Sequence, residues 1–252
     1  MKPFEGKTLF ATGGASGIGA ATARRFHAEG GRVAVVDLNL DAAKKVASEL
    51  DGCIALACDV SDEASVAAAV AAAHEQFGRI DCVLNAAGHV DGGPAEEFSL
   101  ERWNRMMAVH AGGTFLVCRA VIPLMRAIGG GSIVNIGSVA AIIARRNLGA
   151  YCAVKGAIHA LTRQMALDLN DDRIRVNAVA PGPVRTGMTE KFYIERGGGD
   201  YAKGAALSSG DTIQKRVSDP SELAAPICML LSDDGSFMTG AVVVVDGGMT
   251  VI

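Results

Sequence analysis

The stretch TGGASGIG, from Thr12 to Gly19, lies between a short hydrophobic run, Thr8 to Ala11, and an alanine-rich segment typical of a helix, Gly17 to Glu29. Glycine lets a chain turn sharply and lets backbone N–H groups come close to a ligand. A helix that begins directly after such a turn presents free N–H groups and the positive end of its dipole to an anion. The stretch therefore predicts a strand, a tight turn and a helix, with an anion site at the turn.

The order of strand and helix continues along the chain. Short β-branched runs alternate with longer segments rich in alanine and leucine, as in a parallel sheet covered by helices on both faces. The predicted strands are Thr8 to Ala11, Arg32 to Val36, Cys53 to Ala57, Ile80 to Leu84, Ser132 to Ile136, Arg173 to Ala178 and Ala241 to Val245. The predicted helices are Gly17 to Glu29, Asp41 to Leu50, Asp62 to Phe77, Leu100 to Ala127, Ala150 to Leu169 and Pro220 to Leu231. We expect Asp41 to cap the second helix and Ser61 the third.

These elements predict one α/β domain over residues 1–252, with a doubly wound parallel sheet of about seven strands. Ligands of such a sheet bind beyond the carboxyl ends of its strands. The segment 182–218, which contains three consecutive glycines, is the one long interruption of the pattern. Irregular segments of that length are usually functional, and we expect a structureless lid over the ligand site.

The bulk composition points to a small-molecule ligand. A net charge of -3 and a pI near 6.0 give no electrostatic reason to expect nucleic acid or an anionic membrane as a partner. The beginning of the chain has no visible secretory signal, and we find no uninterrupted apolar run of about 18 residues. The 6 cysteines are dispersed without a CxxC pair, which predicts no metal site and reduced thiols in the cytoplasm.

Asp37 ends the second predicted strand, where a carboxylate accepts hydrogen bonds from the ribose hydroxyls of an adenosine. Alone, Asp37 has a second explanation, as a cap of the next helix. Together with the glycine turn, it predicts a Rossmann-type dinucleotide site. A 2′-phosphate near Asp37 would be repelled by about 4 kcal/mol per charge pair at about 4 Å and an effective dielectric near 20. Neither Ala15 nor Leu38 supplies a compensating arginine, so we predict NAD rather than NADP.

A second motif combines Tyr151 and Lys155, whose spacing puts both side chains on one face of a helix. Ser138 follows the predicted strand 132–136 and is expected at the same edge of the sheet. A tyrosine and a lysine at this spacing also occur on surface helices by chance. Their position beside Ser138, at the carboxyl ends of the strands, favours a catalytic group.

With these residues the sequence resembles the short-chain dehydrogenase/reductase family over essentially its full length. The matching motifs occur in the family's order along the chain. They are TGGASGIG at 12–19, Asp59-Val60, Asn85-Ala86-Ala87-Gly88, Ser138, Tyr151 and Lys155, Pro181-Gly182-Pro183-Val184-Arg185-Thr186, and Val245-Asp246-Gly247-Gly248.

The resemblance implies hydride transfer between a nicotinamide and a carbinol carbon. It implies that Tyr151 is the acid/base, that Ser138 holds the substrate oxygen and that Lys155 binds the nicotinamide ribose. A lysine ammonium about 4 Å away would lower the tyrosine pKa from about 10 toward neutrality. The residues implied at the cofactor are Gly13, Ser16, Gly17, Ile18, Gly19, Asp37, Leu38, Asp59, Val60, Asn85, Ala86, Tyr151, Lys155, Val184 and Thr186. Asp59 is also explained as a turn cap, and Asn85 as a tie between two strands.

One position departs from the family pattern. The resemblance aligns Val109-His110 with a Val-Asn pair whose asparagine helps to hold a water that links the lysine to solvent. His110 is therefore a candidate proton relay, a side chain turned away, or a group that gives the site an altered pH dependence between about pH 5 and 8.

The sequence thus predicts an NAD-dependent oxidoreductase that interconverts a secondary alcohol and a ketone. Two alternatives stay open, a 3-oxoacyl thioester reductase and a non-catalytic NAD(H)-binding redox sensor. The family resemblance also implies a homotetramer. Substrate identity is not decided by sequence, because it depends on residues 139–147, 89–94 and 188–217. Among these, Arg145 and Arg146 are compatible with a solvated pair, a subunit contact or an anionic substrate.

Overall fold

The computed structural model describes residues 2–252, and within them seven strands form one sheet in which every neighbouring pair is parallel. The strand order is β3-β2-β1-β4-β5-β6-β7. The strands are β1 (Thr8–Thr12), β2 (Arg32–Asp37), β3 (Ile54–Ala57), β4 (Cys82–Asn85), β5 (Gly131–Ile136), β6 (Ile174–Pro181) and β7 (Val242–Val245). The predicted single-domain, doubly wound sheet is confirmed, and its order reverses between β1 and β4.

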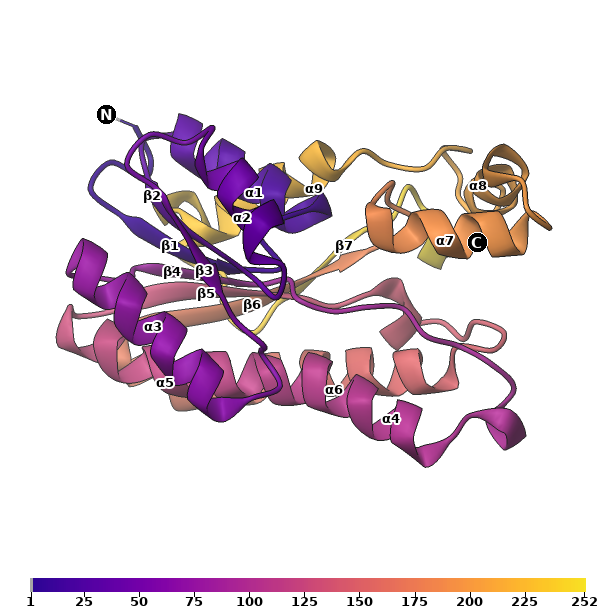
Figure 1. The fold of residues 1–252 in the computed structure, drawn as a ribbon, viewed down its shortest axis with the longest axis horizontal. Helices are drawn as coiled ribbons and strands as arrows, with labels where there is room; N and C mark the ends of the chain where they lie inside the picture. Colours follow the sequence, from indigo (N-terminus) through magenta and orange to yellow (C-terminus); the bar gives the residue numbers. More distant parts are fainter. Residues whose placement is uncertain (1) are drawn as a thin grey trace.

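Helices cover both faces of this sheet (Figure 1). Helices α1, α2 and α9 lie on one face, and α3, α5 and α6 lie on the other, with α4 beside α6. Helices α7 and α8 lie beyond the end of the sheet. The bounds are α1 (Gly17–Ala28), α2 (Leu40–Ala47), α3 (Glu63–Phe77), α4 (Leu100–Met107), α5 (Gly113–Ala127), α6 (Gly149–Asp168), α7 (Gly187–Arg196), α8 (Tyr201–Ser209) and α9 (Pro220–Leu231).

The alternating side chains of the strands build a separate hydrophobic core on each face. Leu9 and Ala11 of β1 pack toward α1 and α9, whereas Phe10 between them packs toward α3 and α5. Leu9, Phe10 and Ala11 are fully buried. Burial on both faces explains why the strands read as nearly continuous apolar runs rather than alternating ones.

Two helices begin at caps that differ from the predicted ones. Asn39, not Asp41, caps α2, and its side chain accepts a backbone N–H of the first turn at 3.1 Å. Asp62, not Ser61, caps α3 through an N–H at 2.6 Å. The Ser61 hydroxyl instead donates to the Asp59 carboxylate at 2.6 Å. Each true cap lies in the extended region of the backbone, from which the side chain reaches the N–H groups of the first turn.

The predicted helix 100–127 is interrupted. A π-helical turn, Ala108–Gly112, separates α4 from α5, and the buried His110 lies within it. A π-helical turn widens a helix locally and is frequently found at functional sites. Uniform apolar periodicity concealed this interruption from the sequence.

By length and composition alone, the run Leu100–Ala127 is apolar enough to cross a membrane. In the fold, its residues Val117, Cys118, Val121 and Met125 are buried in the core on the α3 face of the sheet. A core helix of a globular domain meets the same criteria, so the run is weak evidence for a membrane span.

The segment 182–218 was predicted to be structureless, and this prediction is wrong because the segment contains α7 and α8. Thr186 caps α7 in a reciprocal capping box with Thr189, and Asp200 caps α8. The two helices pack together. The Tyr193 side chain of α7 is buried, and its hydroxyl donates to the carbonyl oxygen of Val184 at 3.5 Å. Polar composition and the three glycines disguised these helices, whose stability comes from packing rather than from periodicity.

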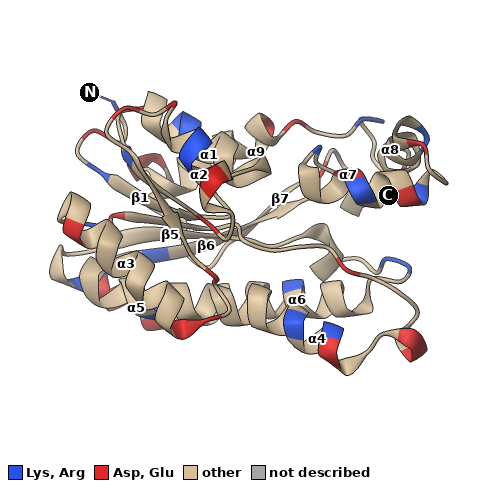
Figure 2. Ribbon diagram, in the orientation of Figure 1, with Lys and Arg blue, Asp and Glu red and all other residues tan. Residues whose placement is uncertain are grey.

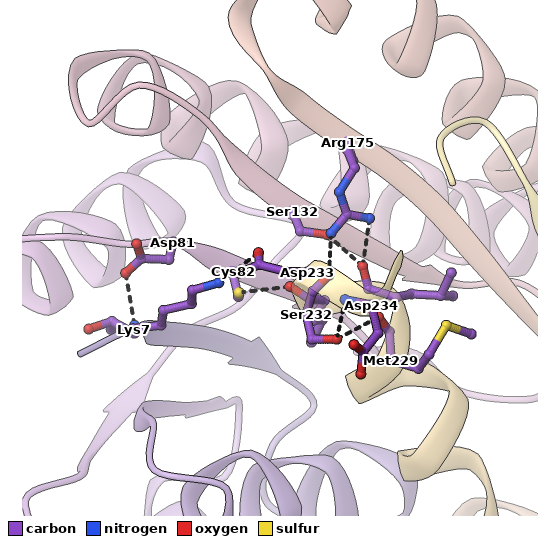
Figure 3. Close-up of polar contacts among 12 residues, drawn as sticks. Lys7, Asp81, Cys82, Ser132, Arg175, Met229, Ser232, Asp233 and Asp234 are labelled. Carbon is purple, nitrogen blue, oxygen red and sulfur yellow. Dashed lines mark hydrogen bonds and ion pairs between the residues drawn. The ribbon is translucent and has the colours of Figure 1, made fainter. Parts of the chain in front are cut away.

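At the opposite edge of the sheet, Arg175 of β6 fastens the end of α9 (Figure 3). Its guanidinium donates to the carbonyl oxygens of Leu230 at 2.8 Å, Ser232 at 2.9 Å and Met238 at 3.3 Å. The last carbonyls of a helix lack partners within the helix, and Arg175 adds a charged donor to them. Other donors share two of these carbonyls, the Ser132 hydroxyl at 3.0 Å from Leu230 O and the Asn177 amide at 2.7 Å from Met238 O. The nearby ion pair of Lys7 and Asp233, at 3.0 Å, is solvent-exposed on the aspartate side.

We predict that Arg175→Met lowers the free energy of unfolding by about 2–3 kcal/mol, because the carbonyls at the end of α9 lose three hydrogen bonds from a charged donor. The matched variant Lys7→Met removes an exposed ion pair and should change it by less than about 1 kcal/mol. Urea denaturation at one protein concentration measures both. Equal effects of the two substitutions would show that Arg175 does not fasten α9.

Candidate active site

A cavity of about 430 Å³ opens at the carboxyl ends of the strands, where the strand order reverses. Every predicted cofactor or catalytic residue lines it except Asn85 and His110. The lining includes Gly13, Ser16, Gly17, Ile18, Gly19, Asp37, Leu38, Asp59, Val60, Ala86, Ser138, Tyr151, Lys155, Val184 and Thr186. The fold therefore brings together residues that are far apart in the sequence.

The glycine turn forms one wall of this cavity. Gly17 has a φ of +51°, and a Cβ there would come within 2.9 Å of the Thr186 side chain. A Cβ at Gly13 would lie 2.7 Å from the carbonyl oxygen of Ala86. Ser16 precedes α1 without capping it through its side chain. The first N–H groups of α1 are thus left for a ligand, as an anion site requires.

Asp37 lies half-buried at the end of β2, next to the glycine turn. One carboxylate oxygen accepts the N–H of Ala15 at 3.1 Å, and the other accepts the N–H of Asn39 at 3.0 Å. Each oxygen keeps a further lone pair for a ligand hydroxyl. The backbone contacts hold the carboxylate in the cavity, and the neighbouring Leu38 is exposed.

Ser138, Tyr151 and Lys155 lie together at the other end of the cavity. Ser138 follows β5 and is 8% exposed, and its Oγ accepts the N–H of Ala140 at 3.1 Å. The Lys155 Nζ lies 5.6 Å from the centre of the Tyr151 ring and donates to the carbonyl oxygen of Ile136 at 2.8 Å. Tyr151 and Lys155, four residues apart on α6, thus lie in the same cavity as Ser138 after β5, as predicted.

Burial sets the proton affinities of this group. It raises the pKa of Tyr151 to about 12, an effect that a hydrogen bond with Ser138 partly opposes. It lowers the pKa of Lys155 to about 7. The sequence predicted that Lys155 lowers the pKa of Tyr151, and the structure differs. Desolvation dominates, and the lysine donates to Ile136 O.

His110 lies behind the cavity wall, with its ring 5.9 Å from the Tyr151 ring. Its Nε2 lies 2.8 Å from the carbonyl oxygen of His89 and 3.2 Å from the His89 N–H, and we assign the proton to Nε2 because the carbonyl contact is the shorter of the two. Burial, reinforced by the charge of Lys155, lowers the pKa of His110 to about 3. The imidazole is neutral above that pH, so the predicted titration between pH 5 and 8 is wrong. Its buried Nδ1 is then an acceptor, and it has no hydrogen-bond partner among residues 2–252.

Asn85 is absent from the cavity lining. Its side-chain amide donates to the Asn135 side chain on the neighbouring strand at 2.9 Å, and Asn135 donates to Thr162 of α6 at 2.9 Å. These contacts support the structural reading of Asn85, a tie between strands. Asp59 lines the cavity and also accepts the Ser61 N–H at 2.9 Å, which combines a turn cap with a place at the site.

Three further residues of the lining, His89, Met188 and Thr189, fall within the stretches 89–94 and 188–217 that the sequence assigned to the substrate pocket. Sequence reasoning missed Arg105 and Gly137. Gly137 lies just after β5, which is a general signal for this edge of the sheet. Arg105 comes from α4, so only the packing of that helix reveals it.

A nicotinamide dinucleotide fits the residues of this cavity. The ends of the cavity are Asp37 and the Tyr151–Lys155 pair, with the uncapped start of α1 between them. A carboxylate for ribose hydroxyls and free N–H groups for a pyrophosphate are the donor and acceptor set that such a molecule needs.

Comparison with known proteins agrees with this arrangement. A family model described as enoyl-(acyl carrier protein) reductase matches residues 13–250. The D-threitol dehydrogenase of Mycolicibacterium smegmatis is 40% identical over 98% of this chain and 94% of its own length. The 2,5-dichloro-2,5-cyclohexadiene-1,4-diol dehydrogenase LinX of Sphingobium indicum is 36% identical over 98% of this chain and 97% of its own length.

A solved structure gives the same result. The crystal structure of levodione reductase superposes with a TM-score of 0.93 at 35% identity, covering 98% of this chain and 99% of that one. A levodione reductase of Leifsonia aquatica is 36% identical to this chain. These relatives oxidise alcohols or reduce ketones by name, and they match nearly end to end. The chain belongs to the short-chain dehydrogenase/reductase family and is an oxidoreductase that acts on alcohol or ketone groups.

Proposed function

We propose that the protein is an NAD(H)-dependent oxidoreductase that interconverts a secondary alcohol and a ketone, with Tyr151 as the acid/base. The observation that carries this proposal is one cavity that joins Asp37 to the Ser138, Tyr151 and Lys155 group. The named relatives, which include dehydrogenases of D-threitol and of a cyclohexadiene diol and a levodione reductase, support the same class of substrate.

Each side chain of the group has a distinct role. A bound nicotinamide supplies the hydride acceptor or donor. Tyr151 transfers the proton at its phenol oxygen, and Ser138, which lines the same cavity, holds the substrate oxygen. When protonated, Lys155 has three N–H groups, of which one is bonded to Ile136. The other two are available for the ribose hydroxyls.

The direction of the Tyr151 shift affects the two reactions differently. With a pKa of about 12, Tyr151 is protonated at neutral pH and is ready to donate to a ketone oxygen. Oxidation of an alcohol needs the deprotonated phenol, so its rate should rise as the pH increases toward that pKa. Positive charge near the phenol oxygen in the loaded site lowers this pKa and assists oxidation.

The two alternative functions gain less support. A 3-oxoacyl thioester reductase commonly uses the phosphorylated cofactor, which the fixed carboxylate of Asp37 disfavours. A redox sensor without turnover has no need for Ser138, Tyr151 and Lys155 to converge in one cavity. His110, which does not line the cavity, is the one feature compatible with a sensor.

We also propose a homotetramer, which the family resemblance implies, and a cytoplasmic location, which the dispersed cysteines favour. Large apolar side chains of α4, α5 and α6 are exposed, among them Trp103, Phe115 and Leu167. On α6 the small residues Ala153 and Ala160 are exposed as well, which allows another helix to approach closely. A helix-covered interface between copies of the chain would bury these groups.

We predict that NAD⁺ binds roughly 100-fold more tightly than NADP⁺, because the carboxylate of Asp37 repels a 2′-phosphate. Asp37→Asn keeps the shape and an acceptor but removes the charge, so the preference should fall to roughly tenfold or less. Calorimetric titration with each cofactor measures both constants. Equal affinities of the two cofactors for the unaltered protein would refute the NAD assignment.

We predict that Tyr151→Phe lowers kcat by about 10³-fold or more, because removal of the acid/base loses the proton-transfer contribution and its geometry. The affinity for NAD⁺ should stay within about threefold, since the cofactor ribose binds to Lys155. Tyr201→Phe on α8 serves as the control and should retain full activity. Substantial turnover by the Tyr151 variant would assign the proton to another group.

We predict that neutral His110 positions a proton-carrying water through its Nδ1 acceptor. His110→Leu keeps the volume without an acceptor and should slow alcohol oxidation by about tenfold, whereas His110→Asn should stay within about threefold. The solvent deuterium isotope effect on kcat should increase only in the Leu variant. Because the pKa of His110 is about 3, no variant should lose a titration between pH 5 and 8. Identical rates and isotope effects in all three proteins would make His110 a packing residue.

A further inference from the structure

A second cavity, of about 1080 Å³, adjoins the catalytic cavity and shares four residues with it. The shared residues are Gly88, His89, Val90 and Met188. We call this second cavity the outer groove. Its walls are the loop 88–93, the loop 144–148 and the inner side of α7. A substrate whose reacting carbon lies at Tyr151 would extend into this groove.

Cations dominate the charged side chains of the outer groove. Five basic residues line it, with two carboxylates. The basic residues are Arg102, Arg145, Arg146, Lys191 and Arg196, and the carboxylates are Asp91 and Glu195. Figure 2 shows basic segments both near α7 and α8 and in the loop below them at this end of the molecule.

Arg102 is committed to the structure of its own loop. Its guanidinium forms an ion pair with Asp91 and donates to the carbonyl oxygen of Gly92 at 2.8 Å. It also lies over the Phe98 ring, 4.2 Å from the ring centre. These contacts hold the loop 88–93 in place, so Arg102 is largely neutralised.

Arg145 and Arg196 share one carboxylate. Asp211 accepts from Arg145 at 3.0 Å and from Arg196 at 3.3 Å. Arg196 also donates to the Ser208 hydroxyl at 3.0 Å. The three charged groups join the loop 144–148 to α7 and to the end of α8, and they retain one uncompensated positive charge.

Arg146 and Lys191 are not paired. Among residues 2–252, no carboxylate oxygen lies within the 4.0 Å ion-pair distance of either cation. Both side chains are exposed, and they come from different walls, Arg146 from the loop 144–148 and Lys191 from α7. Glu195, the remaining carboxylate of the lining, forms no ion pair either and offsets one of the two charges.

Apolar side chains line the same groove. Leu148, Met188 and Phe192 come from the two walls that carry the unpaired cations. Leu148 and Phe192 are half-buried, and Met188 reaches into both cavities. The groove therefore combines an apolar path from the catalytic cavity with cations along it.

We propose that the outer groove binds an anionic group of the substrate, and that the substrate is a secondary alcohol or ketone with a short apolar chain ending in a carboxylate or phosphate. Arg146 and Lys191 are the specificity-determining residues. This inference rests on the proposed function, because the tyrosine end of the cavity fixes where the reacting carbon lies. Of the three explanations open for Arg146, it selects recognition of an anionic substrate.

The test uses hydroxy acids that share a CH(OH)CH₃ group and differ in the distance to the anion. These probes are 3-hydroxybutanoate, 4-hydroxypentanoate and 5-hydroxyhexanoate, each compared with its methyl ester. A phosphate arm compares 4-hydroxypentyl phosphate with 1,4-pentanediol. At one chain length the anion should exceed its neutral partner in kcat/KM by about tenfold, and this ratio should fall as salt screens the exposed cations.

Variants assign the effect to named residues. Arg146→Gln and Lys191→Gln should each lower the anion-to-neutral ratio by about two- to fivefold, as expected for exposed charges, and the double variant should nearly abolish it. Turnover of the neutral partners should be unchanged. Lys203→Gln on α8, an exposed lysine outside the groove, is the matched control and should leave the ratio intact.

The outcomes separate this inference from the proposed function. If the esters and the diol are turned over without any preference for the anions, the proposal that the outer groove binds an anion is wrong, and the proposed function is unaffected. A preference that survives the double variant also overturns it. Calorimetric titration of the acids and the phosphate into the enzyme with NADH provides a readout that is independent of turnover. If no probe is turned over and none binds, the result counts against both the proposed function and the anion site in the outer groove.

Discussion

The reversal of strand order between β1 and β4 is the constraint on which the rest of the molecule depends. From β1 the chain crosses over one face of the sheet, through α1, and reaches β2. From β4 the chain crosses over the other face, through α4 and α5, and reaches β5 on the other side. Because the two crossovers leave in opposite directions, their loops separate at the carboxyl edge, and a crevice opens there. The glycine turn, Asp37 and Ser138 are all placed by strands that end at this crevice.

Desolvation is the second physical influence on the site. The same burial that brings Tyr151 and Lys155 together stabilises the neutral form of both, so it raises one pKa and lowers the other. Two neutral groups cost less to hold in a dry cavity than an ion pair whose charges are poorly aligned. Charges that arrive with ligands then determine how the pair is protonated during the reaction.

Much of this architecture was predictable from sequence, and the reasons are local. The strands are β-branched and apolar on both faces, and Tyr151 and Lys155 follow a helical spacing that no tertiary contact alters. The start of α2 was wrong by a residue or two because Asn39 and Asp41 are both good caps, and only backbone geometry selects between them. The π-helical turn around His110 and the helices α7 and α8 depend on packing between distant segments, which periodicity does not record.

The pKa of His110 marks a further limit of sequence reasoning. A histidine suggests titration near neutrality, but an imidazole that is 1% exposed beside a lysine stays neutral. The identity of the residue was informative, and its environment reversed the conclusion. The same holds for the outer groove, where Arg145 and Arg196 became partners of one aspartate only through the fold.

The network of Arg175 at the amino edge has a consequence for how this chain can change over evolutionary time. It secures α9 to the sheet at the edge opposite the cavity, through backbone carbonyls rather than through particular side chains of the helix. The loops 88–93 and 144–148 at the carboxyl edge take no part in this network. Substitutions and insertions there can alter substrate preference while the scaffold persists, which separates the inheritance of stability from the diversification of specificity.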